Sequence, residues 1–484
     1  MYNYTWYRNF SPQTIAIIGG GLSGTLVAVN LMKNATTPLI IKLIERRKEI
    51  GKGIAYSTTI DGHLLNVPAG KMSAFADKPN HFLDWLQANG HHNVTENTFI
   101  SRKIYGNYIQ AVLEQAQANA PTQVHFEKIT DEAIAIEAKN NYIKIYLRQG
   151  QCLQAQKAVL ALGNPPPSLP SAIAAFSQNS SYIKDAWSGD ATSNLNPEDS
   201  ILLLGTGLTM VDVVVSLHQQ GFRGKIHAVS RHGLIPQPHQ HTISSYPAFI
   251  DLETAPKTVR ELLKLIRQEV KKATKQGQNW QAVIDALRPV TPELWEALPL
   301  KEQQRFLRHA KAYWETHRHR IAREIHEVLK SIENLGQLSY YAGRIQACQK
   351  SENKVSVTIR KRGTNTDITL QVNRIINCTG SNCNYRRLQD PLIASLQQQG
   401  LIRPHALGIG IDTAANGTVI DVKGNISEIL YTLGPPRKGN LWETTAVGEI
   451  RLQATNLVEE LLKPVNCQSD THTRTDSLYL NSFN

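Results

Sequence analysis

Short continuous runs of apolar residues alternate with stripes of helical spacing along most of the 484-residue chain. The run from Ile15 to Ile18 predicts a buried strand, and the spacing from Leu22 to Met32 predicts an amphipathic helix. A second run, Leu39 to Ile44, predicts another strand. A strand, a helix and a strand in this order indicate a βαβ unit with a parallel sheet.

The turn between the first expected strand and the helix carries three glycines in the pattern G-x-G-x-x-G, at Gly19, Gly21 and Gly24. In a dinucleotide fold these glycines permit a tight turn, close approach of a pyrophosphate, and close packing of the helix on the strand. The second strand ends at Glu45, about 20 residues after the last glycine, where an acid accepts hydrogen bonds from ribose. The pattern favours FAD or NAD over a glycine turn in some other α/β domain.

Further runs predict strands over residues 124–129, 133–138, 142–147 and 157–162, which together have the pattern of an antiparallel β-meander. Three prolines at 165–167 follow, and they predict a linker because proline cannot continue a strand.

A second βαβ pattern starts with a buried run at Ser200 to Leu204, followed by Gly205 and Gly207. Met210 stands where the third glycine would be, so the fingerprint is incomplete. The next strand, over residues 225–229, ends near Arg231. A basic residue there suits a 2′-phosphate and favours NADP over NAD, while a surface arginine is the alternative interpretation.

Residues 254–335 have helical spacing throughout, with helices expected at 259–275, 280–287, 292–297 and 301–334. This segment is predicted to be a helical insertion that caps the site. Arg318 and Arg320, within the run HRHR, are expected to face solvent or phosphate. Near the C-terminus another helix is expected to run to about Leu462, with Asn440 or Glu443 as its N-terminal cap.

Composition narrows the class of protein. Apolar residues make up 41% and charged residues 19% of the chain, as in soluble globular proteins, and no apolar run approaches the ~20 residues that span a bilayer. The first residues lack the apolar core of a signal peptide, so a cytoplasmic location without membrane association is expected. Five scattered cysteines, without a C-x-x-C, argue against a disulfide framework, a zinc site and a redox pair.

The net charge of +12 does not indicate a nucleic-acid partner. Residues 254–330 alone contain 16 Lys and Arg against nine Asp and Glu, and no RNA-binding aromatic motif accompanies them. A solvated helical face, or attraction for an anionic cofactor and substrate, accounts for this excess more simply.

Seven stretches together resemble one family, the YdhS-like group of FAD/NAD(P)-binding proteins, and the likeness spans about Ile15 to Leu462. The group is similar to FAD-dependent urate hydroxylase and, more distantly, to the flavin N-hydroxylating and Baeyer–Villiger monooxygenases. The resemblance implies FAD in the first unit and NAD(P)H in the second, and leaves the substrate open. The stretches are GGGLSG from Gly19, GKGIAYST from Gly51, HLLNVPAGKMS from His63, GTGLTMVD from Gly205, SRHGLIP from Ser230, HRHR from His317, and LWETTAVGEIR from Leu441.

The expected fold class is therefore α/β, with two Rossmann-like dinucleotide-binding domains, for FAD and NAD(P), a β-meander and a helical insertion. Residues 1–170 and 373–465 are expected to form the FAD-binding domain. Residues 195–372, with the insertion at 254–335, are expected to form the NAD(P)-binding domain, and 466–484 a flexible tail.

Cofactor contacts are expected from both glycine turns, the ends of the following strands and the C-terminal segment, without any metal. Asn66, Met72, Trp442 and His239 are candidate neighbours of the flavin ring or the substrate, although packing or loop structure would also explain each. No catalytic side chain is assigned. The expected cofactor-binding residues are Gly19, Gly20, Gly21, Leu22, Ser23, Gly24, Glu45, Arg46, Asn66, Met72, Ile129, Gly205, Gly207, Leu208, Thr209, Arg231, Gly380, Glu443, Thr444 and Thr445.

Three functions fit these features. The first is an NAD(P)H-dependent flavin monooxygenase, in which NADPH or NADH reduces FAD and O2 then oxygenates a small-molecule substrate. The second is an NAD(P)H-dependent flavin reductase or oxidase without oxygenation. The third is a non-enzymatic sensor that binds FAD and NAD(P). The oligomeric state is left open.

Overall fold

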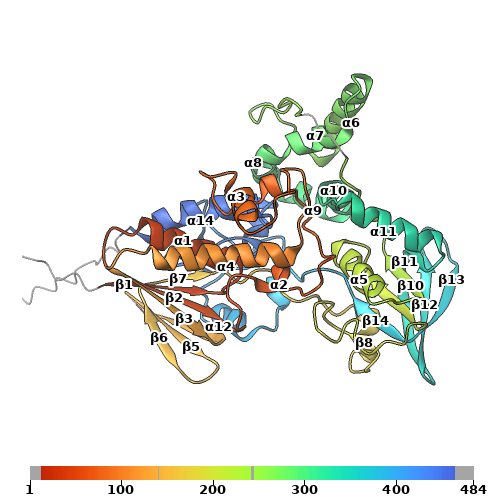
Figure 1. Ribbon diagram of the computed structural model, residues 1–484, viewed down its shortest axis with the longest axis horizontal. Coiled ribbons are helices and arrows are strands. Elements are labelled where there is room, and N and C mark those ends of the chain that lie inside the picture. Colours follow the sequence, from red (N-terminus) through yellow and green to blue (C-terminus); the bar gives the residue numbers. More distant parts are fainter. Residues whose placement is uncertain (1–11, 140, 241–244, 464–484) are drawn as a thin grey trace, which may run out of the picture.

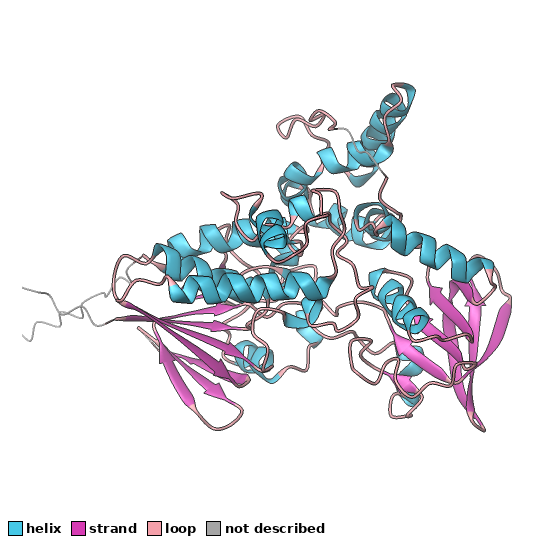
Figure 2. Ribbon diagram, in the orientation of Figure 1, coloured by secondary structure: helices cyan, strands magenta, loops and turns pink. Residues whose placement is uncertain are grey.

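The computed structural model describes residues 12–139, 141–240 and 245–463, so the expected tail at 466–484 lies outside the described residues. Two α/β lobes lie side by side, and a group of helices projects from the top of the molecule between them (Figure 1). The strands gather in the two lobes, and the projecting part is helical (Figure 2). The expected fold class is thus confirmed.

The first lobe is built on a six-stranded sheet in the order β15-β16-β7-β1-β2-β3. Its strands are parallel except for the antiparallel edge pair of β15 and β16. The parallel strands bring their carboxyl ends to one edge, where ligands bind in open α/β sheets. The strands are β1 (Gln13–Ile18), β2 (Leu39–Glu45), β3 (Val124–Thr130), β7 (Lys157–Leu160), β15 (Thr418–Ile420) and β16 (Ile426–Thr432).

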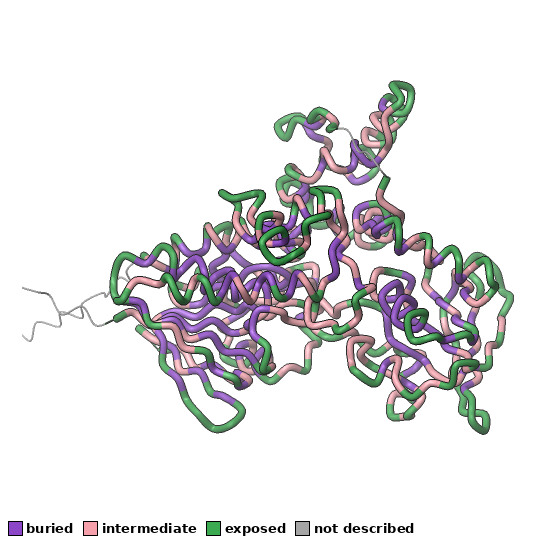
Figure 3. The backbone as a smooth tube through the Cα atoms, viewed as in Figure 1, coloured by how far each residue is buried: buried purple, intermediate pink, exposed green. Residues whose placement is uncertain are grey.

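Three helices cover one face of this sheet: α1 (Leu22–Asn34), α4 (Arg102–Ala118) and α14 (Val447–Leu461). Helix α1 lies between the other two and is almost entirely buried, as its apolar composition requires. In Figure 3 the purple, buried parts of this lobe lie mainly between the helices and the sheet, where the core is. Because α14 comes from the C-terminal segment, the first lobe combines both ends of the described chain.

The opposite face carries a three-stranded antiparallel sheet, β4 (Ala133–Ala138), β5 (Ile143–Leu147) and β6 (Cys152–Ala155), and helix α12 (Pro391–Gln398). The meander expected over residues 124–162 is therefore wrong at both ends. Strand β3 follows the crossover helix α4 and so pairs in parallel with β2. Strand β7 is buried along its whole length and pairs in parallel with β1, as a central strand does.

The second lobe contains a seven-stranded sheet in the order β13-β12-β11-β10-β9-β14-β8. Helices α5 (Leu208–Gln219) and α11 (Arg323–Asn334) cover one face, and the short 3-10 segment Ser171–Phe176 packs on the other. The strands are β8 (Tyr182–Ile183), β9 (Ser200–Leu204), β10 (Lys225–Ser230), β11 (Leu338–Ser351), β12 (Lys354–Lys361), β13 (Asp367–Val372) and β14 (Arg374–Asn377).

The expected boundaries of the second domain are too narrow. Strand β14 lies within the C-terminal FAD part expected from residue 373, but it pairs with β9 inside the second sheet. Strand β8, which precedes the expected start at 195, pairs with β14. Strand β8 has only two residues and carries little sequence signal, and the place of β14 depends on its pairing with β9, so the second lobe extends from about 171 to 377.

The last helix expected in the insertion is divided into three shorter helices. The helix expected over 301–334 is interrupted at Ala310 and again at residues 319–322. At the second break the chain leaves the helix to pair with a loop, because Ile321 donates to the carbonyl of Gln237 and accepts from the N–H of His239. The insertion helices are α6 (Val259–Lys275), α7 (Trp280–Ala286), α8 (Thr291–Ala297), α9 (Leu300–His309) and α10 (Lys311–Arg318).

The remaining helices are short: α2 (Gly53–Tyr56) and α3 (His81–Ala88) in the first lobe, and α13 (Lys438–Leu441) before α14. No helix in the described ranges is long and apolar enough to cross a membrane.

The buried Lys157 of β7 fastens α14 to the sheet. Its Nζ donates to the carbonyl oxygens of Glu460 and Leu461, at 3.0 and 2.9 Å, and to that of Lys463 at 2.6 Å. A cation at a helix C-terminus satisfies carbonyls that have no partner within the helix and opposes the negative end of the helix dipole. This contact fixes the C-terminal helix against the strand that lies next to β1.

Candidate functional site

The turn between β1 and α1 leaves no space for side chains at two of its glycines. Gly19 has φ +106°, its N–H donates to the carbonyl of Ile44 at 2.8 Å, and a Cβ on it would lie 2.3 Å from the carbonyl oxygen of Ala161. A Cβ on Gly24 would lie 1.9 Å from the carbonyl oxygen of Gly19. Packing within the protein therefore requires both glycines.

Gly21 differs from these two glycines, because the protein itself does not require it. A Cβ on Gly21 would lie 3.4 Å from the nearest heavy atom, the Cα of Gly53, which is an ordinary contact. Gly21 is also the N-cap of α1, where no described side chain caps the helix and no acidic residue occupies the first turn. Unpaired N–H groups at the positive end of a helix bind anions, so this end can hold a pyrophosphate.

Glu45 lies at the end of β2, buried against this turn. Its Oε2 accepts from the N–H of Gly20 at 2.7 Å, and its Oε1 accepts from the N–H of Arg47 at 3.0 Å. A carboxylate has about four lone-pair sites, so these two bonds orient Glu45 and leave acceptor capacity for ribose hydroxyls. The structure thus brings the first glycine turn and Glu45 together.

The second turn, between β9 and α5, repeats this geometry. The N–H of Gly205 donates to the carbonyl of Val229 at 2.7 Å, and a Cβ on Gly205, which has φ +113°, would lie 2.4 Å from the carbonyl oxygen of Cys378. At Gly207, the N-cap of α5, a Cβ would meet no described heavy atom within 4 Å. Met210 takes the place of the third glycine and is fully buried in the core beneath α5.

The other expected cofactor residues differ in exposure. Arg46, Arg231, Gly380 and Thr445 are exposed, whereas Asn66, Leu208 and Thr209 are half-buried. The buried ones are Leu22, Ser23, Met72, Ile129, Glu443 and Thr444.

The segment before α14 reaches the first glycine turn. The hydroxyl of Thr444 donates to the carbonyl of Gly434 at 2.9 Å, and a Cβ on Gly434 would lie 3.0 Å from the Oγ of Ser23. Helix α14 itself begins after Ala446 without a side-chain cap among the described residues, so the expectation that Asn440 or Glu443 caps it is wrong. Glu443 instead pairs with the insertion.

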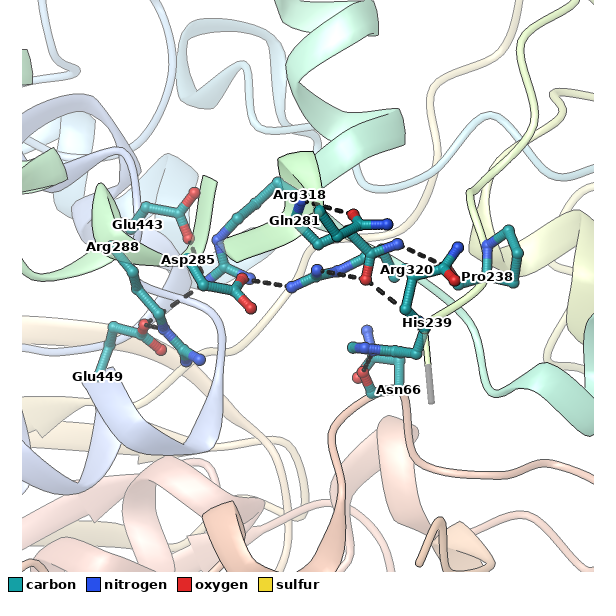
Figure 4. A network of polar contacts seen from close by, with 12 residues as sticks. Asn66, Pro238, His239, Gln281, Asp285, Arg288, Arg318, Arg320, Glu443 and Glu449 are labelled. Carbon is teal, nitrogen blue, oxygen red and sulfur yellow. Dashed lines mark hydrogen bonds and ion pairs between the residues drawn. The ribbon is translucent and has the colours of Figure 1, made fainter. Parts of the chain in front are cut away.

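Ion pairs join the insertion to this segment, and the pair of Arg318 with Glu443 is buried (Figure 4). Arg318 Nη2 lies 3.1 Å from Glu443 Oε2, and Trp314 Nε1 donates to the other oxygen of Glu443 at 3.1 Å. Arg288 Nε donates to Glu449 Oε1 of α14 at 2.8 Å. The Arg318 side chain is 8% exposed, so the expectation that it faces solvent or phosphate is wrong.

Arg320 is also buried, with a side chain 4% exposed, and connects the insertion to the second lobe. It forms an ion pair with Asp285 of α7, and its Nη1 donates to Gln281 Oε1 at 2.8 Å. Gln281 Nε2 donates in turn to the carbonyl of Pro238 at 2.9 Å. The sequence pattern does not reveal this role because Arg320 lies in the helix break at 319–322, which depends on pairing with a distant loop.

His239 bridges that loop to the first lobe (Figure 4). Its Nε2 lies 3.0 Å from the carbonyl oxygen of Asn66, so Nε2 carries a proton and donates. Burial, and then the nearby Arg320, lower the pKa of His239 to about 4, and the ring is therefore neutral near pH 7. Asn66 and His239, two expected neighbours of the flavin ring or substrate, are thus brought into contact.

A second connection between the lobes was not predicted from the sequence. Arg102, the first residue of α4, places Nη1 2.8 Å from Asp212 Oδ2 of α5. His63 Nε2 lies 2.8 Å from Ser216 Oγ, one turn further along α5. His63 stands in the HLLNVPAGKMS stretch, but no spacing in the sequence relates it to Ser216. The helix that starts at the second glycine turn is therefore fixed to the first lobe.

Comparisons with known proteins agree with this architecture. Residues 16–165 match a family model described as FAD-NAD(P)-binding. No curated protein sequence matches the chain. Among solved structures, L-lysine 6-monooxygenase from Pseudomonas syringae has a TM-score of 0.64 at 14% identity, over 93% of this chain and 99% of that one.

Two further structures show the range of proteins that share the fold. The FAD-bound cadaverine monooxygenase of desferrioxamine biosynthesis from Erwinia amylovora has a TM-score of 0.64 at 12% identity, over 98% of this chain and 100% of that one. A bacillithiol disulfide reductase from Staphylococcus aureus has a TM-score of 0.55 at 12% identity, over 93% and 98%. At these identities the likeness establishes the two-lobed fold.

The buried ion pair predicts a large effect of Arg318→Met on stability. Removing the guanidinium leaves Glu443 as a buried charge without its cation, which costs about 3 kcal/mol of unfolding free energy. Urea denaturation of the two proteins measures the difference. The matched control is Arg323→Met, since Arg323 forms an exposed pair with Glu327 and its loss should cost at most about 0.5 kcal/mol. Equal effects of the two substitutions would contradict the structural role of Arg318.

The lowered pKa of His239 predicts a pH dependence of stability. Between pH 6.5 and about 4 the unfolded chain binds a proton at this residue that the folded protein does not bind, so acid favours unfolding. This stability is fully present above pH 6.5, and falls by up to about 1.4 kcal/mol per pH unit below it. The variant His239→Gln should lose stability less steeply than the wild type between pH 6.5 and 5 in denaturant titrations. Identical slopes would show that His239 does not titrate as a buried group.

Proposed function

We propose that the protein is an NAD(P)H-dependent FAD oxidoreductase, and specifically a flavin monooxygenase that acts on a small molecule. The observation that carries this proposal is the repeated glycine turn. Each turn has a middle glycine, Gly21 or Gly207, where there is room for a Cβ. Each of these glycines is the N-cap of a helix, and no side chain among the described residues caps that helix. Two such turns in one chain suit two dinucleotides.

The residues of the first lobe fit FAD. Gly21 and the start of α1 would hold the pyrophosphate, and Glu45 would accept from the ribose hydroxyls. Asn66 and the segment around Thr444 would flank the flavin. FAD supplies electron transfer between a nicotinamide and O2, while the protein positions the reactants and excludes water.

The residues of the second lobe fit NAD(P)H. Gly207 and the start of α5 would hold its pyrophosphate, with Leu208 and Thr209 in the first turn. The contacts of Arg102 and His63 with α5 would keep this nucleotide oriented toward the first lobe. Hydride transfer requires such a fixed orientation, since small displacements of the reacting atoms reduce the rate strongly.

A small-molecule substrate would bind beneath the insertion, near the junction formed by Asn66, His239 and the buried arginines. The fold likeness to the lysine and cadaverine monooxygenases supports oxygenation. We also propose that the protein belongs to the YdhS-like group, because the sequence stretches named above resemble that group. We propose in addition that O2 is a co-substrate and that the protein is cytoplasmic.

The main alternative is an NAD(P)H-dependent reductase or oxidase without oxygenation. The fold likeness to a bacillithiol disulfide reductase supports it. The two functions differ in their products. An oxidase consumes NAD(P)H steadily and converts O2 to H2O2 without a substrate, whereas a monooxygenase consumes NAD(P)H faster when its substrate is present and releases little H2O2. A non-enzymatic sensor would bind FAD that neither nucleotide reduces.

The two middle glycines provide the test. The substitution Gly21→Ala should leave the fold intact but reduce the FAD content of the purified protein at least about tenfold, because the Cβ occupies the approach of the pyrophosphate. Gly207→Ala should retain FAD and lower the rate of anaerobic flavin reduction by NADH or NADPH at least about tenfold. Absorbance spectra and stopped-flow mixing measure both effects.

The outcomes distinguish the two sites. Wild-type protein without bound flavin, or with flavin that neither nucleotide reduces, would overturn the proposed function. If Gly207→Ala reduced its flavin at the wild-type rate, the second turn would not be the nucleotide site. Circular dichroism of both variants checks that the fold is retained.

A further inference from the structure

The two units differ at the residue that follows the second strand of each. Gly19 donates to Ile44, and the next residue is Glu45; Gly205 donates to Val229, and the next residue is Ser230. Ser230 therefore occupies the place of the ribose-binding acid. Its Oγ accepts from the N–H of Gly233 at 2.9 Å and from the hydroxyl of Thr206 at 2.9 Å. The second unit has no carboxylate at this place that would repel a 2′-phosphate.

Two arginines from different elements lie around this serine. Arg231 is its neighbour in the chain. In the parallel pairing of β10 with β11, Ser230 is opposite Ala342, and the carbonyl of Ala342 accepts from the N–H of Arg362 at 2.9 Å. Arg362 belongs to the turn between β12 and β13, and the antiparallel pairing of β12 with β11 brings its backbone to the end of β10.

The charge of these arginines is not neutralised by the protein. Both are exposed, and within the described residues neither has a carboxylate oxygen within 4 Å. The neighbouring Arg360, by contrast, forms an ion pair with Asp367. His232, the next residue in the chain after Arg231, has its pKa lowered by burial and then by the charges of Arg362 and Arg231. The backbones of Arg231 and Arg362 thus meet at the end of β10, and the charges of both side chains act on His232.

We propose that Arg231 and Arg362 together bind the 2′-phosphate of NADPH, and that Arg362 is a specificity-determining residue for NADPH over NADH. This inference rests on the proposed function, because it assumes a nucleotide at the second glycine turn. A phosphate monoester carries about −1.5 to −2 charges near pH 7 and has three acceptor oxygens, and guanidinium groups match it with paired hydrogen bonds. Arginine also retains its charge at any physiological pH.

The test uses the FAD-containing enzyme and two probes, adenosine 2′,5′-bisphosphate and 5′-AMP, which differ only in the 2′-phosphate. Titration calorimetry should give tighter binding of the bisphosphate by at least about tenfold. Arg362→Ala should weaken the bisphosphate about tenfold and leave 5′-AMP unchanged, and Arg231→Ala should act in the same direction. The control Arg360→Ala, on the same hairpin, should change neither affinity.

Each other result overturns the inference. Equal affinities of the wild type for the two probes would show that the 2′-phosphate is not bound. Equal losses for both probes in Arg362→Ala would indicate a structural role, and unchanged bisphosphate affinity would exclude Arg362. Flavin reduction by saturating NADH is measured in parallel. If it persists while the probes show no 2′-phosphate preference, the inference fails and the proposed function stands; if neither nucleotide reduces the flavin, the proposed function fails as well.

Discussion

Both lobes depend on the close approach of a carbonyl oxygen to the first glycine of a turn. In the first lobe the end of β7 brings Ala161 O against Gly19, and in the second the end of β14 brings Cys378 O against Gly205. Any side chain at either glycine would force the central strands apart. The approach fixes where α1 and α5 begin, and so it fixes the two helix N-termini that can receive phosphate groups.

The insertion depends on a different interaction, the pairing of charges that are buried or half-buried. Arg288, Arg318 and Arg320 meet Glu449, Glu443 and Asp285 at the junction of the insertion with both lobes. Buried pairs contribute little net stability compared with apolar packing, yet removing one partner is costly. Such pairs therefore specify one docking position of the insertion against the two lobes.

The sequence predicts correctly those elements that depend only on residues close together in the chain. The glycine turn of the first unit, Glu45 at the end of β2, and the helix at 259–275 follow from spacing within short segments. The errors arose where distant segments decide. Strands β3 and β7 look like parts of a meander until their parallel partners are known, and the helix over 301–334 breaks because Ile321 pairs with the loop at Gln237. Arg320, which lies within this break, turns inward for the same reason. The position of Arg362 next to the end of β10 also depends on the register of the sheet, which cannot be read from the spacing of residues in one sequence.

The most direct test of the account is anaerobic single-turnover reduction of the bound flavin by two samples of labelled NADH. One sample carries deuterium on one face of nicotinamide C4, and the other sample carries it on the opposite face. The account predicts that the flavin is bleached, with a primary isotope effect for deuterium on one face only, because the second lobe holds the nicotinamide in one orientation against the first. Flavin that stays oxidised would contradict direct hydride transfer between the two lobes. Reduction would also contradict it if neither face gave an isotope effect and an added carrier exchanged electrons with the flavin rapidly.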